Sequence, residues 1–161
     1  MATAARTAPF AERELSIARV FNAPRELVFK AWTDPKQLAE WWGPKSFTNP
    51  VCEVDLKPGG ALRIVMRAPD GAEYPMKGVF REIVPPSRLV FTNIALDKDG
   101  NHIIEGLTTV TFVAEGGKTK LTLQTRGAAM VDYAAAYLQG MEAGWTQSLE
   151  KLEALVRRAV S

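Results

Sequence analysis

The sequence predicts an α+β fold in which one strand and two short helices precede an antiparallel sheet and a long C-terminal helix. Apolar residues recur at helical spacing over residues 24–44, alternate with a period of two over residues 51–126, and return to helical spacing over residues 131–160. At 161 residues the chain is long enough for one domain with a sizeable core. We expect a mobile Ala-rich leader over residues 1–13 and a single domain over residues 14–161.

Composition narrows the classes of function. Hydrophobic residues make up 47% of the chain and charged residues 24%, as in ordinary globular proteins. The net charge of +2 is too balanced for a nucleic-acid-binding surface. The single cysteine, Cys52, excludes an internal disulfide and fits a reducing compartment, and no apolar run is long enough for a signal peptide or a membrane span. We therefore expect a cytoplasmic protein that binds neither nucleic acid nor membrane.

The first strand and the helix pair are marked by prolines. Residues 14–21 alternate as a strand does, and Pro24 stands where a helix can begin, because its missing N–H would be unpaired there anyway. Asp34 is a good N-cap for a second helix with Pro35 at its first position, and Gly43-Pro44 ends that helix. This stretch contains three of the four tryptophans, Trp32, Trp41 and Trp42.

Six strand candidates follow, separated by short turns rich in Gly, Pro and Asp. They cover residues 51–56, 61–67, 73–84, 88–94, 105–114 and 118–126. Such short connections predict an antiparallel meander, since parallel neighbours need long crossovers. Alternation places one set of apolar side chains on the inner face: Leu62, Ile64, Met66, Tyr74, Met76, Phe80 and Phe112.

Residues 131–160 predict one long amphipathic helix whose apolar stripe includes Met141 and Trp145. Gly140 and Gly144 lie inside it, although each glycine costs a helix about 1 kcal/mol relative to alanine. With Ser148 they form a row of small residues at a spacing of four. The row favours either close packing of the helix against the sheet or room for a ligand at mid-helix.

The residues that usually perform catalysis form no recognisable set. His102 is the only histidine, and it lies in a loop-like stretch about fifty residues from Cys52, which is not a metal-ligand spacing. We interpret His102 as solvated and Cys52 as a small buried hydrophobic residue. A lone histidine also leaves no Ser-His-Asp arrangement to assign. The sequence thus predicts no catalytic residue, no metal site and no cofactor.

Some polar residues on the strands leave alternatives open. Glu53 and Asp55 share one strand face, where paired carboxylates either divide acid and base roles or are simply solvated. Glu82 has the same parity as the inward-facing Phe80, so it is either buried with an arginine partner or turned outward by strand twist. Glu82 and Arg63 are the polar candidates for a cavity.

Three segments, residues 19–44, 55–92 and 140–155, resemble the START-like (SRPBCC, helix-grip) superfamily to which the birch-pollen allergen belongs. The resemblance is closest to the branch named after the activator of the heat-shock protein ninety ATPase. Its motif residues here are structural, namely Pro24, Trp41-Trp42, Gly59-Gly60 and Trp145. The resemblance implies a cavity between the sheet and the long helix. The cavity candidates are Trp32, Trp41, Trp42, Leu62, Ile64, Met66, Tyr74, Met76, Phe80, Phe112, Met141, Gly144 and Trp145.

Three functions fit this prediction. The first is binding of a small apolar or lipid-like ligand between sheet and helix, with tryptophans and methionines as adaptable walls. The second is an enzyme of cyclase, dehydratase or hydrolase type acting on a ketide-like or aromatic substrate. The third, suggested by the name of the branch, is a chaperone partner, which we expect not to be found. A homodimer through an edge strand stays open, as does whether side chains fill the cavity.

Overall fold

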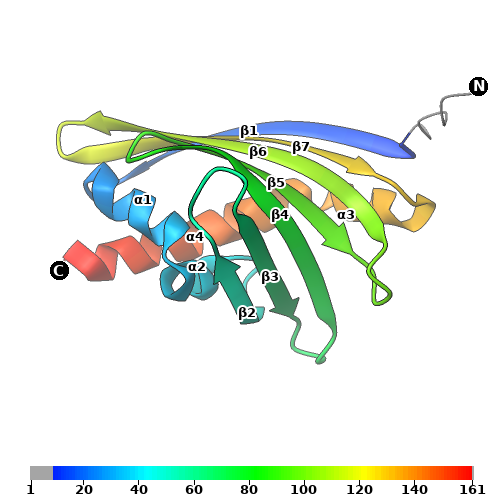
Figure 1. The fold of residues 1–161 in the computed structure, drawn as a ribbon. Coiled ribbons are helices and arrows are strands. Elements are labelled where there is room, and N and C mark those ends of the chain that lie inside the picture. Colours follow the sequence, from blue (N-terminus) through cyan, green and yellow to red (C-terminus); the bar gives the residue numbers. More distant parts are fainter. Residues whose placement is uncertain (1–8, 161) are drawn as a thin grey trace, which may run out of the picture.

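In the computed structural model, which describes residues 9–160, seven strands form one curved antiparallel sheet around a long helix (Figure 1). The strand order is β1-β7-β6-β5-β4-β3-β2. The strands are β1 (Ala11–Phe21), β2 (Thr48–Val54), β3 (Ala61–Arg67), β4 (Glu73–Val84), β5 (Arg88–Leu96), β6 (His102–Glu115) and β7 (Lys118–Ala129). The helices are α1 (Arg25–Thr33), α2 (Pro35–Trp41), the 3-10 turn η1 (Asp132–Ala134), α3 (Ala135–Gln139) and α4 (Met141–Val160). The predicted fold class is therefore confirmed.

The helix pair forms as the prolines predict. Asp34 caps α2 by accepting a hydrogen bond from the Lys36 backbone N–H at 3.1 Å, and Pro35 occupies the first helical position. The indole N–H of Trp41 donates to the Ala31 carbonyl at 2.9 Å, which ties the second helix to the first. Both helices lie on the concave side of the sheet beside α4 (Figure 1).

The C-terminal segment differs from the single helix predicted over residues 131–160, because the helix is interrupted at Gly140, between α3 and α4. The guanidinium of Arg13, on β1, donates to the carbonyls of Leu138 and Gln139, each at 2.9 Å. These carbonyls belong to the last turn of α3, where backbone acceptors would otherwise lack partners. A contact with a distant strand thus stabilises the end of α3, and helical periodicity carries no signal for it.

Several strands are longer than their sequence patterns predict. β1 begins at Ala11, so residues 11–13, which we assigned to the leader, are paired with β7; residues 1–8 lie outside the described part of the chain. β6 begins at His102, which the sequence placed in a loop, and β7 continues to Ala129. These extensions are fixed by pairing between strands, for example Ala11 opposite Ala129, which a single strand's alternation does not reveal.

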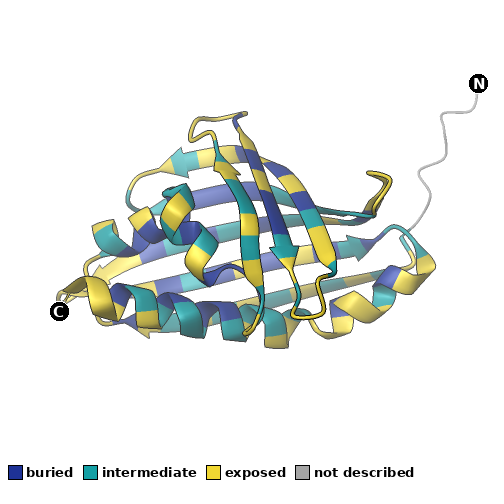
Figure 2. Cartoon of the chain, turned by 90° about the horizontal axis from the view of Figure 1, so that it is seen from below, coloured by how far each residue is buried: buried dark blue, intermediate teal, exposed yellow. Residues whose placement is uncertain are grey.

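Two clusters of buried side chains make up the core (Figure 2). The larger cluster combines the tryptophans and phenylalanines of α1, α2, β4, β5 and β6 with leucines of β7 and α4. The smaller one contains Ile103, Ala129, Ala134 and Leu138, near the start of α4. Buried and exposed residues alternate along the strands, as expected for a sheet with one face turned toward the core (Figure 2).

Candidate ligand-binding cavity

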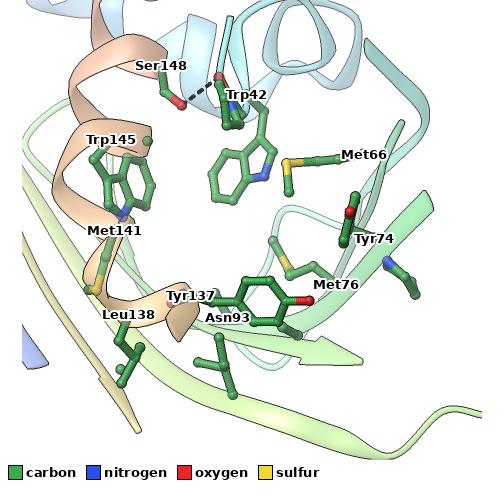
Figure 3. Close-up of a pocket in the computed structure, with 17 residues that line it drawn as sticks. Trp42, Met66, Tyr74, Met76, Asn93, Tyr137, Leu138, Met141, Trp145 and Ser148 are labelled. Atoms are coloured by element: carbon green, nitrogen blue, oxygen red, sulfur yellow. Dashed lines mark hydrogen bonds between the residues drawn. The ribbon is translucent and has the colours of Figure 1, made fainter. Parts of the chain in front are cut away.

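A cavity of about 230 Å³ lies between the first half of α4 and the sheet (Figure 3). Its walls come from the loop after α2, from strands β3 to β7, and from α3 and α4. Seventeen described residues line it: Trp42, Gly43, Pro44, Met66, Tyr74, Pro75, Met76, Asn93, Ala95, Ile104, Gly127, Tyr137, Leu138, Met141, Gly144, Trp145 and Ser148.

The cavity exists because inward-facing side chains become smaller along the sheet. At what we call the closed end, the sheet presents Phe91, Val110, Phe112, Leu121 and Leu123, each at most 2% exposed. At the open end the inward positions of β5, β6 and β7 are Asn93, Ala95, Ile104, Gly106 and Gly127. Helix α4 contributes another small residue, because a Cβ added to Gly144 would meet no atom within 4 Å. The sheet and helix therefore leave unfilled volume here.

Three tryptophans form the boundary between the two ends. Trp145 lines the cavity and stacks on Trp32, with ring centroids 6.1 Å apart and an interplanar angle of 20°. Trp32 is 2% exposed and belongs to the larger core cluster. Trp42 meets Trp145 edge to face, with centroids 5.3 Å apart at 78°. The cavity wall therefore rests on the most densely aromatic part of the core.

The loop after α2 is held against α4 by hydrogen bonds. The buried Ser148 hydroxyl donates to the Gly43 carbonyl at 2.9 Å (Figure 3), and the Lys151 ammonium donates to the carbonyl oxygen of Pro44 at 3.1 Å and of Trp42 at 3.4 Å. Burial lowers the pKa of Lys151. Gly43 has a φ of 92°, which favours glycine, so this position also sets the path of the loop. These contacts fix Trp42 at the cavity wall.

The chemical character of the wall is apolar and uncharged. Met66, Met76 and Met141 supply thioethers, and the half-exposed rings of Tyr74 and Tyr137 lie at the mouth (Figure 3). Apart from these tyrosines and the indole N–H groups of Trp42 and Trp145, the polar side chains are Asn93 and Ser148, and the Ser148 hydroxyl is already bonded to Gly43. A wall of this kind suits a largely apolar molecule with few hydrogen-bonding groups.

The structure divides the sequence-predicted cavity residues between the two ends. Seven of them line the cavity: Trp42, Met66, Tyr74, Met76, Met141, Gly144 and Trp145. The other six lie in the larger core cluster instead: Trp32, Trp41, Leu62, Ile64, Phe80 and Phe112. Alternation and helical period assign a side chain to a face. They do not say how far along that face the packing ends.

The two polar candidates, Arg63 and Glu82, lie away from the cavity and form exposed ion pairs. Arg63 Nη1 is 3.2 Å from Glu53 Oε1, and Arg88 Nε is 3.0 Å from Glu82 Oε1. A register shift explains Glu82: Phe80 pairs with Phe91 while Glu82 pairs with Val90, so one extra residue sits in β4. Such a bulge reverses the parity of the following residues, and of the two alternatives the outward one is correct.

Sequence reasoning missed several cavity residues. Tyr137 was missed because it lies on α3, which the sequence pattern merged with α4 into one helix, and Gly127 lies one residue beyond the predicted end of its strand. Asn93 could have been found, since it has the parity of the inward-facing Phe91 and Ala95 on β5. A polar residue at an inward position is an informative signal.

Other groups considered from the sequence lie elsewhere. His102 Nδ1 is 2.8 Å from Glu105 Oε2 in an exposed pair, and Asp55 Oδ2 is 3.7 Å from Lys57 Nζ. Burial, with smaller contributions from Asp34 and Glu53, raises the pKa of the half-buried Cys52 to about 11. Over residues 9–160, no three His, Cys, Asp or Glu residues are grouped so that they could hold a metal ion. None of the helices described has both the length and the apolar character needed to cross a membrane.

Comparison with solved structures finds proteins of similar fold over most of the chain. Solved structures with similar folds include a protein from Chromobacterium violaceum, with 31% identity, a TM-score of 0.75 and coverage of 89% of this chain and 96% of that one. An Arthrobacter aurescens protein has 26% identity, a TM-score of 0.76 and coverage of 90% and 86%. An AHSA1 protein from Silicibacter pomeroyi has 27% identity, a TM-score of 0.75 and coverage of 88% and 96%.

No functionally curated protein matches the sequence. The family model described as "Activator of Hsp90 ATPase homolog 1-like protein" matches residues 22–157, which include the helix pair, six of the seven strands in full and nearly all of α4. A match over most of the chain, together with the helix-grip architecture, means that this protein belongs to the Activator of Hsp90 ATPase homolog 1-like family.

Proposed function

We propose that the protein binds a small, neutral and largely apolar molecule in the cavity between the sheet and α4, as a carrier or a sensor. The observation that supports this most directly is the cavity of about 230 Å³ whose lining residues are all uncharged. Small-molecule sites in proteins are typically apolar concavities with a few placed polar groups. The family is of a ligand-binding fold type, which agrees with this use of the space.

The arrangement of the walls also supports ligand binding over an incidental packing gap. Gly43, Gly127 and Gly144 approach the cavity from the loop, the sheet and the helix, so three separate elements carry the smallest side chain at the same place. Glycine inside a helix costs about 1 kcal/mol relative to alanine. Gly144 carries this cost although nothing lies within 4 Å of an added Cβ, so no neighbouring atom requires glycine there. A need for empty volume beside α4 explains it.

Native and denaturing mass spectrometry of the freshly purified protein, with analysis of its organic extract, tests the proposal. We expect a stoichiometric extra mass that disappears on denaturation. In the Gly144→Leu variant the new side chain should enter the cavity, and the bound mass should be lost. Ala143→Leu is the matched control, because the same side chain is added to the same helix at an exposed position.

Two results would contradict the proposal. One is an apo mass for the wild-type protein that does not change when a panel of aromatic metabolites and lipids is added. The other is equal ligand binding by the Gly144→Leu and Ala143→Leu variants, because the ligand would then occupy some other surface.

A further inference from the structure

The Asn93 side chain is the amide that the sheet contributes to the cavity wall, where Tyr74 of β4 supplies a hydroxyl. Asn93 lies on β5 opposite Gly106 of β6, which in turn pairs with Gly127 of β7. Its Oδ1 atom accepts a hydrogen bond of 2.8 Å from the Thr108 hydroxyl, whose oxygen is 2.9 Å from that of Thr125. Thr108 and Thr125 are 0% and 4% exposed. A buried pair of hydroxyls therefore supports an amide at the cavity edge.

The direction of these hydrogen bonds determines what the amide offers to a ligand. A hydroxyl has one proton, so Thr108, which donates to Asn93, must accept from Thr125. The bond from Thr108 orients the carbonyl oxygen of the amide toward Thr108, and neither N–H group of Nδ2 has an acceptor among the described residues. Hydrogen bonds in such a chain polarise one another, which strengthens the outer donor.

Space around Asn93 is provided by the glycines beside it. A Cβ added to Gly106 would come within 2.7 Å of Nδ2, so the amide lies where a side chain on β6 would otherwise stand. Within residues 9–160, two fully buried side-chain N or O atoms lack a partner, namely Trp32 Nε1 and Asn49 Oδ1. The Nδ2 atom of Asn93 also lacks a partner but is not fully buried, so this donor is accessible on a residue that lines the cavity.

We propose that Asn93, positioned by Thr108 and Thr125, is the hydrogen-bond donor that selects the ligand: a neutral aromatic molecule of one or two rings with a carbonyl-type oxygen. This inference rests on the proposed binding function. The volume of about 230 Å³ lies between a cavity of about 150 Å³ that binds benzene and the lower bound of roughly 300 Å³ for larger ligands. Aromatic and thioether walls suit a flat ring system.

Charge selectivity follows from the same wall. A carboxylate ligand would lose its hydration shell among lining residues that carry no charge, which is unfavourable without a cationic partner. The nearby Lys151 ammonium donates to the carbonyls of Trp42 and Pro44, on the loop behind the wall. The cavity should therefore prefer a ketone to a carboxylate of the same size.

Calorimetric titration with three matched ligands tests this proposal. The ligands are 2-acetylnaphthalene, its isostere 2-isopropenylnaphthalene, in which CH₂ replaces the carbonyl oxygen, and the anion 2-naphthoate. We expect the ketone to bind roughly tenfold more tightly than the alkene, because one hydrogen bond is gained. The anion should bind more weakly than the ketone.

Variants assign the preference to the amide. Asn93→Leu keeps a similar shape without donors, so the ratio of ketone to alkene affinity should fall to about one while alkene binding persists. Thr108→Val should reduce the ratio in part, because the amide is then free to rotate. Thr109→Val, at the neighbouring position on the other face of β6, is the control and should leave the ratio unchanged. Backbone amide spectra of each variant verify that the fold is retained.

The outcomes separate this inference from the proposed function. If ketone and alkene bind equally well, or if Asn93→Leu leaves the ratio unchanged, the cavity binds ligands but Asn93 does not select them. Binding of 2-naphthoate more tightly than the ketone would also overturn the inference. If none of the three ligands binds and no co-purifying mass is found, the proposed function fails as well.

Discussion

The closed and open ends of the sheet–helix interface are built from the same strands and the same helix, yet they are packed differently. At the closed end, Phe112 makes edge contacts with Phe29 and Trp32, at centroid distances of 5.3 and 6.3 Å. At the open end, β7 and α4 present Gly127 and Gly144, and about 230 Å³ is left unfilled. The contrast teaches that the closed end can stabilise the fold while the open end leaves room for a ligand.

The largest expected difference is in the free energy of unfolding after side-chain truncation. Phe112→Ala at the closed end should cost about 3–5 kcal/mol, because it opens a cavity in a filled core. Met66→Ala at the open end should cost only about 1–2 kcal/mol, since Met66 is half-buried and already borders empty volume. Urea denaturation measures both values. Equal losses would mean that the two ends are equally packed.

The second prediction concerns Cys52, which packs against the larger core cluster. Its pKa is raised from 9.0 to about 11, mainly by burial. Because the thiolate is the reactive form, the alkylation rate at pH 7 should be roughly a hundredfold below that of a thiol with the ordinary pKa. The rate with iodoacetamide should rise with pH until about pH 11, and a cavity ligand should not change it. A plateau near pH 9 would contradict this prediction.

The same shift links Cys52 to stability at high pH. A thiol that stays protonated to higher pH in the folded state than in the unfolded state contributes stability. This stability is fully present below pH 9.0 and is lost as pH rises toward about 11. Comparison with Cys52→Ala, whose stability should lack this dependence, isolates the contribution of the thiol.

The third prediction is a moderate effect at the boundary between the two ends. Ser148→Ala removes the 2.9 Å hydrogen bond to the Gly43 carbonyl and should cost about 1–2 kcal/mol, because a buried acceptor loses its donor. Ligand affinity should fall too, since Gly43 and Trp42 belong to the cavity wall. Thr146→Ala, at an exposed position of the same helix, is the control. An unchanged affinity in Ser148→Ala would show that the loop is held by its other contacts.

The smallest prediction compares two glycines of the open end. Gly144→Ala should stabilise the protein by about 0.5–1 kcal/mol, because it relieves the helical cost of glycine and meets no neighbouring atom within 4 Å. Gly127→Ala should give no such gain, because its Cβ would come within 3.1 Å of Leu138 Cδ2. Thermal unfolding measures both. If Gly144→Ala destabilises the protein, the space beside α4 is smaller than described.

Particular residues show how far sequence reasoning reached into the site. Met66, Met76, Met141 and Trp145 were placed correctly on the inner face by strand alternation and helical period, and they line the cavity. Phe112 satisfies the same pattern but lies in the closed core. Its face is a local property, whereas its distance from the unfilled volume depends on how strands far apart in sequence are aligned.

The sequence by itself determined the order of the elements, the antiparallel meander, the capped helix pair and the inner face of most strands. These follow from local chemistry: proline at helix starts, glycine and aspartate in turns, and a period of two or 3.6 residues. Only the tertiary structure decided that Arg13 donates hydrogen bonds to the end of α3, that a bulge turns Glu82 outward, and that Asn93 faces a cavity. Each of these depends on contacts or register between separate strands and helices, and such pairing is fixed only when the whole sheet closes around the helix.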